Sequence, residues 1–128
     1  MRLKSLLDKE GITPDLYSLD QCFMINPEDI RLIIKTAELK PTDYVLEIGA
    51  GTGMLTKKLC KAARKVIAVE KDRRLIKILS RMLSKEKNVE IVSNDIIKTG
   101  IPQVNKIVSN LPYGIVDWFF EQLQKTDI

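Results

Sequence analysis

The stretch YVLEIGAGTG, residues 44–53, decides the fold of this chain. An apolar, strand-forming run leads directly into three alternating glycines. Because glycine costs backbone entropy, three glycines in five residues indicate a turn with positive φ or a place where a ligand touches the main chain. Residues 54–59 then have helical spacing, so the loop precedes a helix N-terminus, where free amides favour negatively charged groups. The stretch predicts a strand, a cofactor loop and a helix.

Length and composition indicate one globular domain with a modest core: 128 residues, of which 45% are apolar and 30% charged. Apolar runs are too short to cross a bilayer, and charges interrupt the start of the chain, so we expect no membrane association and a cytoplasmic protein. The two cysteines lack CxxC spacing and the chain has no histidine, which argues against a metal site.

The net charge of +4 points towards an anionic partner. Residues 57–87 hold 12 Lys and Arg against 3 Asp and Glu, more than half of the 21 basic residues in the chain. Two interpretations stay open. The stretch is either a nucleic-acid footprint or the solvated faces of two surface helices.

Strands and helices alternate along the chain. The predicted strands are 44–48, 65–70, 89–92 and 106–109, and the predicted helices are 3–11, a helix starting at Asn26-Pro27, 52–63, 72–84 and 115–124. Residues 93–105 are too short and too broken by Gly100 and Pro102 for a full helix, so a short turn or crossing loop is expected. This alternation predicts a parallel sheet with right-handed crossovers. With strand order 3-2-1-4, the loops after strands one and four become neighbours.

The glycines continue a motif that begins at Glu47 and reads ExGxGxG. Met54 stands where a dinucleotide fingerprint has glycine or alanine, so the motif instead follows the class I S-adenosylmethionine-dependent methyltransferases. That ligand has an amino acid tail in place of a pyrophosphate, and it needs close backbone approach and donors for a carboxylate. For the glycines alone, a structural turn without a ligand remains an alternative.

Two more acids follow predicted strand ends. Glu70 ends the second strand, where a carboxylate can accept both ribose hydroxyls. Asp95 follows the third strand and can accept from an adenine amine, while the amide of Ile96 can meet a ring nitrogen. Each acid alone is also typical of a helix cap or turn. Acids at three successive strand ends favour the cofactor site.

The segment after the fourth strand reads NLPY, residues 110–113. The Asn110 side chain and a carbonyl of Leu111 or Pro112 can accept hydrogen bonds from an exocyclic amine and direct its lone pair towards a methyl donor. Tyr113 can stack on the base. A proline turn with an incidental aromatic residue is the alternative interpretation.

In order and spacing these motifs, together with QCFM at 21–24, resemble the KsgA-type small-subunit rRNA adenine N6,N6-dimethyltransferases, which share their fold with the erythromycin-resistance methylases. The resemblance covers about residues 19–123. It implies a Rossmann-like α/β domain that transfers methyl groups from S-adenosylmethionine to N6 of adenine in small-subunit rRNA. The implied cofactor-binding residues are Gln21, Phe23, Glu47, Gly49, Gly51, Glu70, Lys71, Asn94, Asp95, Ile96 and Asn110, and the implied catalytic residues are Asn110, Leu111, Pro112 and Tyr113.

The chain also departs from the family pattern. Cys22 and Met24 replace the usual residues, and 114–117 differ from the usual continuation of NLPY. The family sheet has seven strands and a helical RNA-contacting domain, whereas this chain stops after the helix that follows strand four. The strand-four edge at 107–108 and the aromatic helix around 118–120 would then be exposed. We expect a fragment of a longer protein, truncated after strand four, or a chain completed by self-association.

The resemblance implies an N-terminal helix and cofactor-contacting segment at 1–26, a partial methyltransferase domain at 27–128, and small-subunit rRNA or a pre-ribosomal particle as the partner. Two alternatives remain open. One is a truncated fragment that binds S-adenosylmethionine, and perhaps RNA, without turnover. The other is a methyltransferase for DNA adenine or protein glutamine, although Leu111 favours RNA.

Overall fold

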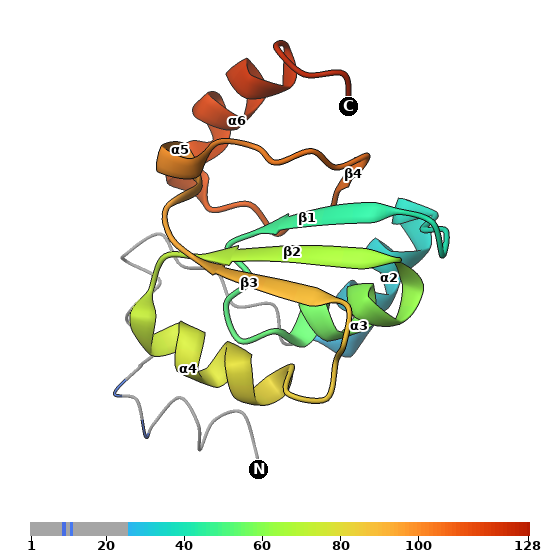
Figure 1. The fold of residues 1–128 in the computed structure, drawn as a ribbon, viewed down its shortest axis with the longest axis vertical. Coiled ribbons are helices and arrows are strands. Elements are labelled where there is room, and N and C mark those ends of the chain that lie inside the picture. Colours follow the sequence, from blue (N-terminus) through green and yellow to red (C-terminus); the bar gives the residue numbers. More distant parts are fainter. Residues whose placement is uncertain (1–8, 10, 12–25) are drawn as a thin grey trace.

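A computed structural model describes residues 9, 11 and 26–128 of the chain (Figure 1). The predicted helix at 3–11 and the QCFM segment fall wholly or largely outside the described residues. The elements, in order, are α2 (Pro27–Ala37), β1 (Tyr44–Ile48), α3 (Met54–Ala62), β2 (Lys65–Glu70), α4 (Arg73–Met82), β3 (Val89–Ser93), α5 (Ile96–Thr99), β4 (Lys106–Ile107), η2 (Tyr113–Ile115) and α6 (Val116–Leu123).

The four strands form one parallel sheet in the order β3-β2-β1-β4. This order confirms the one predicted from the alternation of strands and helices. β1 lies in the middle, with Val45 opposite Val66 of β2 and opposite Lys106 of β4. The carboxyl ends of all four strands therefore open at the same edge of the sheet.

Successive side chains of a strand point to opposite faces of the sheet, and each face of this sheet packs against a layer of helices. Val45 and Val66 point into a core shared with α2 and α3, and Ala68 packs against Leu79 of α4. On the other face, Leu46 belongs to a core that includes Ile96 of α5 and residues of α6. Helices α2, α3 and α4 thus cover one face, and α5 and α6 cover the other (Figure 1).

The helices begin where capping groups are available. The side chain of Asn26 accepts from the Glu28 amide at 2.9 Å and starts α2, as the Asn-Pro pair predicts. The prediction that the next helix starts at Thr52 was wrong. Gly53 holds φ 87°, a left-handed conformation that a helix interior cannot contain, so α3 begins at Met54. The Asp72 side chain caps α4 through the Arg74 amide at 2.9 Å.

The fourth strand is shorter than the predicted 106–109, with ladder pairing at Lys106–Ile107 alone. The chain beyond it still follows β1: the Val108 amide donates to Leu46 at 3.0 Å and the Ser109 hydroxyl to the Ile48 carbonyl at 2.5 Å. The preceding connection contains only the one-turn helix α5, which Gly100 ends with φ 75°. This matches the expected short turn.

Within the part of the chain that the structure describes, no helix has both the length and the apolar character needed to cross a membrane.

Candidate functional site

A pocket opens at the carboxyl ends of the strands, where the connections after β1, β2, β3 and β4 meet. Its lining is Ile48, Gly49, Gly51, Val69, Glu70, Lys71, Leu75, Asn94, Asp95, Ile96, Asn110, Pro112 and Ile115. Polar groups from all four connections therefore face one space with several apolar side chains between them. Such a lining suits a ligand with both apolar and hydrogen-bonding parts.

The glycine loop forms one wall of the pocket. Gly49, Gly51 and Gly53 have φ values of 72°, 60° and 87°, so this backbone path favours glycine at each position. The amides of Gly49 and Ala50 both donate to the Val69 carbonyl, at 2.8 and 3.1 Å, and attach the loop to the end of β2. The loop is thus a fixed turn whose backbone can be approached closely.

Glu70 braces the glycine loop from the end of β2. One carboxylate oxygen accepts from the Gly51 amide at 2.8 Å and the other accepts from the Asp72 amide at 3.0 Å. The side chain is buried, and this burial raises the pKa of Glu70 above its usual value. Because a carboxylate oxygen has more than one lone pair, Glu70 can brace the loop and still accept hydrogen bonds from a ligand in the pocket.

Glu47 lies beneath the loop, on the α3 face of the sheet, and does not line the pocket. Its side chain is buried and accepts a hydrogen bond from the Thr56 hydroxyl of α3. The pKa of Glu47 is raised to about 8: burial is the largest cause, the Thr56 hydrogen bond opposes the shift, and the charge of Glu70 adds to it. In this arrangement Glu47 joins the end of β1 to the first turn of α3, the two elements that flank the loop.

The connection after β3 supplies Asn94, Asp95 and Ile96. Asp95 caps α5, because its side chain accepts from the Ile97 amide at 3.0 Å, and Asn94 accepts from the Asp95 amide at 2.8 Å. The cap interpretation of Asp95 therefore holds, and the same residue still lines the pocket. A cap uses one of its two carboxylate oxygens and leaves the other for a ligand.

The segment after β4 forms the wall opposite Glu70. Asn110 and Pro112 line the pocket, whereas Leu111 packs into the core beneath α6. Tyr113 begins η2, and 78% of its surface is exposed. The four residues of the NLPY motif therefore lie in three different environments: the pocket, the core and the exposed surface. The predicted residues Gln21 and Phe23 lie outside the described residues.

Four apolar lining residues are absent from the sequence-based prediction: Ile48, Val69, Leu75 and Ile115. Ile48 and Val69 stand at or next to strand ends, where a signal was available, because the last residues of parallel strands border such a pocket. The supporting residues Thr56 and Ser109 were also missed. Their role depends on neighbours distant in sequence, which no local pattern reveals.

The sequence model of the family described as ribosomal RNA adenine dimethylase matches residues 17–127. This chain belongs to that family. It is 42% identical over 113 residues to the probable ribosomal RNA small subunit methyltransferase A of Methanosarcina acetivorans, covering 88% of this chain and 41% of the relative. The enzyme of the same description from Pyrococcus abyssi is 44% identical over 126 residues, covering 98% and 46%.

Solved structures confirm the Rossmann-like class I methyltransferase fold of this family member. A dimethyladenosine transferase from Plasmodium falciparum superposes with a TM-score of 0.77 at 35% identity, covering 83% of this chain and 39% of that chain. The 23S rRNA methyltransferase ErmE gives 0.72 at 37% identity, covering 79% and 42%. The chain spans less than half the length of these relatives.

Proposed function

We propose that the protein transfers methyl groups from S-adenosyl-L-methionine to N6 of adenine in small-subunit rRNA. The observation that carries this proposal is the contact between the NLPY segment and the glycine loop. A Cβ atom on Gly49 would lie 3.1 Å from Cγ of Pro112, and both residues line the same pocket. The two motifs therefore share one space, in which a donor and an acceptor can meet.

The residues around the pocket fit S-adenosylmethionine, which supplies an electrophilic methyl group on a sulfonium. Glu70 accepts from the ribose hydroxyls, Asp95 accepts from the adenine amine, and the Ile96 amide donates to the ring. The backbone at Gly49 and Gly51 faces the methionine part, and Glu47 joins β1 to α3 on the two sides of this loop through Thr56. The family membership adds Gln21 and Phe23 to the proposed cofactor contacts.

The acceptor adenine is proposed to enter beside Asn110, extruded from its stack. The Asn110 side chain and a carbonyl of Leu111 or Pro112 accept from the exocyclic amine, and the exposed Tyr113 ring stacks on the base. The nitrogen lone pair forms a bond to the methyl carbon as the carbon–sulfur bond breaks, and the amine proton leaves to solvent. Positioning and electrostatics suffice for this in-line displacement, so no strong base is required.

The remaining assignments follow from the same proposal. Residues 1–26 form a cofactor-contacting segment in front of a partial methyltransferase domain, 27–128, and the partner is rRNA or a pre-ribosomal particle in the cytoplasm. Self-association through the β4 edge and α6 is supported by the two-residue pairing of β4 and by Phe120, which is 58% exposed. Sedimentation of the chain over a range of concentrations tests that last point, and a monomer throughout would contradict it.

A methylation assay tests the proposed function directly. Small-subunit rRNA transcribed in vitro is incubated with labelled S-adenosylmethionine and either wild-type protein, Asn110→Ala or Tyr113→Ala. Removing one positioned acceptor costs about 100-fold in rate, so we expect a loss of that order in Asn110→Ala. Gln103→Ala is the matched control, because it also removes an amide side chain, but an exposed one that does not line the pocket.

Calorimetry with S-adenosylmethionine completes the test. Binding by wild type and by both NLPY variants, with methylation lost only in the variants, supports the proposal. Full activity in Asn110→Ala would remove that residue from the mechanism. Binding without any methylation by wild type would instead support a fragment that holds the cofactor without turnover.

A further inference from the structure

The basic stretch noted in the sequence folds into an almost purely cationic surface. Among residues 57–87, ten of the twelve Lys and Arg are exposed, and none of the three acids is. Glu70 is buried in the pocket and Asp72 forms an ion pair with Arg74 at 2.9 Å. Glu86 is half-buried, and its charge acts on the buried thiol of Cys60. Because none of these three acids is exposed, the outer surface of the helices in this stretch is positively charged.

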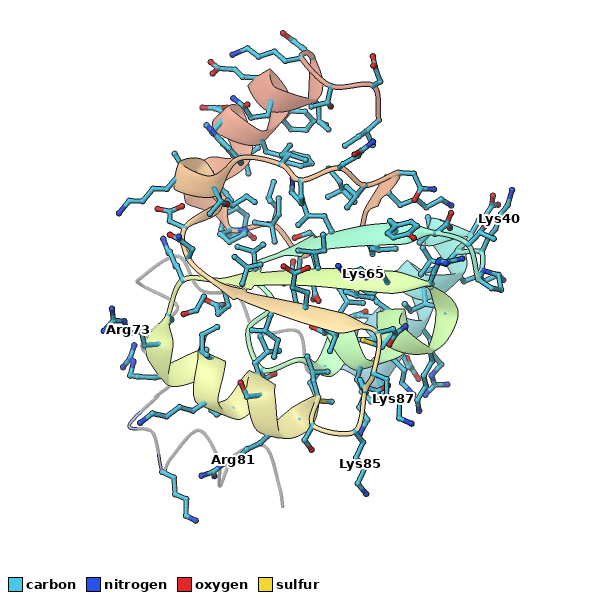
Figure 2. All side chains as sticks on the ribbon, viewed as in Figure 1. Lys40, Lys65, Arg73, Arg81, Lys85 and Lys87 are labelled. Atoms are coloured by element: carbon cyan, nitrogen blue, oxygen red, sulfur yellow. The ribbon has the colours of Figure 1, made fainter. Side chains whose placement is uncertain are left out.

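Part of this charge is ordered along α4. Arg73, Lys77 and Arg81 follow one another at intervals of four residues, which places them on one side of the helix. Lys85 and Lys87 continue the series in the turn before β3. In Figure 2, Arg73 lies at the start of α4 and Arg81 near its end, both directed away from the sheet, while Lys85 and Lys87 lie at the turn between α4 and β3. Lys40 and Lys65 lie elsewhere.

Arg73, Arg81, Lys85 and Lys87 are called the α4 tract below. All four are exposed, and within the described residues no carboxylate forms an ion pair with any of them. Lys65, by contrast, pairs with Glu90 at 2.9 Å. The tract therefore presents positive charge that no carboxylate of the described chain neutralises.

The α4 tract starts at the pocket. Lys71 lines the pocket and Arg73 is the first residue of α4, so the tract begins two residues from the pocket lining. It then extends about 15 Å along the ten residues of α4, at 1.5 Å per residue, and continues to Lys87. If one monomer of an anionic polymer occupied the pocket, the adjacent monomers could lie on the α4 tract.

We propose that the α4 tract binds the phosphate backbone of the RNA that flanks the target adenine. This inference rests on the proposed rRNA substrate and deepens it by assigning a path for the RNA from the pocket over α4. Contacts between Lys or Arg and phosphates position an RNA without reading its sequence. The tract thus adds affinity and orientation, while the pocket selects the base.

The test compares two variants with the same change in net charge. The tract variant is Arg73→Gln/Arg81→Gln/Lys85→Gln/Lys87→Gln. The control variant is Arg31→Gln/Lys35→Gln/Lys40→Gln/Lys125→Gln, which removes four exposed cations from α2, from the turn before β1 and from the C-terminal end. Circular dichroism and denaturant unfolding check that both variants fold.

Binding of in vitro transcribed small-subunit rRNA is then measured for the 128-residue chain at several salt concentrations. The tract variant is expected to bind at least tenfold more weakly near 0.1 M salt. Its slope of log Kd against log salt should fall by about 3, because each lost phosphate contact removes about 0.7–0.9. The control variant should stay within threefold of wild type, and calorimetry should give unchanged S-adenosylmethionine affinity in both variants.

An equal loss of rRNA affinity in both variants would show that only net charge matters and would overturn the inference. A tract variant with the affinity and salt slope of wild type would also overturn it. If the tract variant loses affinity only for assembled small subunits and not for naked rRNA, the surface binds a ribosomal protein and the RNA assignment is overturned. The proposed function fails separately, when wild-type protein does not methylate rRNA. The binding comparison requires no methyl transfer.

Discussion

Gly49 lies directly against Pro112: a Cβ atom on the glycine would be 3.1 Å from the proline Cγ and 3.3 Å from its Cδ. The first residue follows the central strand and the second follows the edge strand that pairs with it. A methyl group at this position would be tighter than an ordinary contact, so Pro112 would have to move by a few tenths of an ångström to accept it. The contact also sets the spacing of the two halves of the pocket, so its disturbance should be visible in both stability and ligand binding.

The first prediction concerns this contact. Gly49→Ala places a side chain at φ 72° and against Pro112, so we expect a loss of about 1–3 kcal/mol in the free energy of unfolding. S-adenosylmethionine affinity should fall at least tenfold, as measured by calorimetry. Gly100→Ala is the control, because it also has positive φ but its Cβ would meet nothing within 4 Å. It should destabilise the fold without changing affinity. Unchanged affinity in Gly49→Ala would contradict the prediction.

The second prediction concerns pH and the buried carboxyl of Glu47. Its folded-state pKa is raised to about 8 from 4.5, so between these values the folded protein holds a proton that the unfolded chain has released. The free energy of unfolding therefore falls as pH rises through this window, by at most about 1.4 kcal/mol per pH unit. Glu70, whose pKa is also raised, contributes with the same sign.

Urea unfolding between pH 5 and 8 tests this for Glu47→Gln. The amide keeps an acceptor for the Thr56 hydroxyl but cannot ionise, so the fall in stability with pH should become shallower. Glu90→Gln is the control, because this exposed carboxylate pairs with Lys65 at the surface. Identical pH slopes in wild type and Glu47→Gln would show that Glu47 does not carry the effect.

The third prediction concerns Glu70 as the brace of the glycine loop. Glu70→Ala leaves the Gly51 and Asp72 amides without their acceptors, and we expect a loss of about 2–3 kcal/mol in unfolding free energy together with a large loss of cofactor affinity. Glu70→Gln keeps one acceptor oxygen and should lose less of both. Glu86→Ala serves as the control by calorimetry and denaturant unfolding. If Glu70→Ala bound the cofactor like wild type, the residue would have no role in the pocket.

The fourth prediction concerns the attachment of β4 at its start. The Asn105 side chain accepts from the Tyr44 amide at 2.7 Å and donates to the Asp43 carboxylate at 2.8 Å. Asn105→Ala should lower the free energy of unfolding by about 1–2 kcal/mol while cofactor affinity stays unchanged, since the residue lies at the opposite end of the sheet. Gln103→Ala, an exposed neighbour, should change neither. Equal stability of the two variants in denaturant would contradict the prediction.

The strand order and the family could be predicted from the sequence because both depend on local signals. β-branched runs separated by helices lead to the parallel order, and NLPY after the fourth run identifies the resemblance. The ends of elements were less predictable. Thr52 appeared helical until Gly53 proved left-handed, and β4 stops at Ile107 although Val108 and Ser109 have strand character.

The site was predictable as a set of polar residues but not as a geometry. Sequence placed Glu47 among the residues that bind the cofactor, whereas in the structure it lies behind the loop, because the alternation of β1 turns it towards α3. Leu111, which is partly buried, packs against the core that α6 covers. Such orientations depend on contacts between residues that are far apart in sequence, so local sequence patterns do not predict them.

The late position of β4 in the chain has a consequence for the order of folding. The strands β1, β2 and β3 with α3 and α4 form a continuous segment whose contacts join neighbours in sequence, so the wall made by the glycine loop and Glu70 can assemble early. The opposite wall waits for β4 to pair with β1, which closes a loop of about sixty residues, as in the Ser109–Ile48 and Asn105–Tyr44 bonds. We therefore expect the half of the pocket that is proposed to receive the base to form last and to open first by local unfolding.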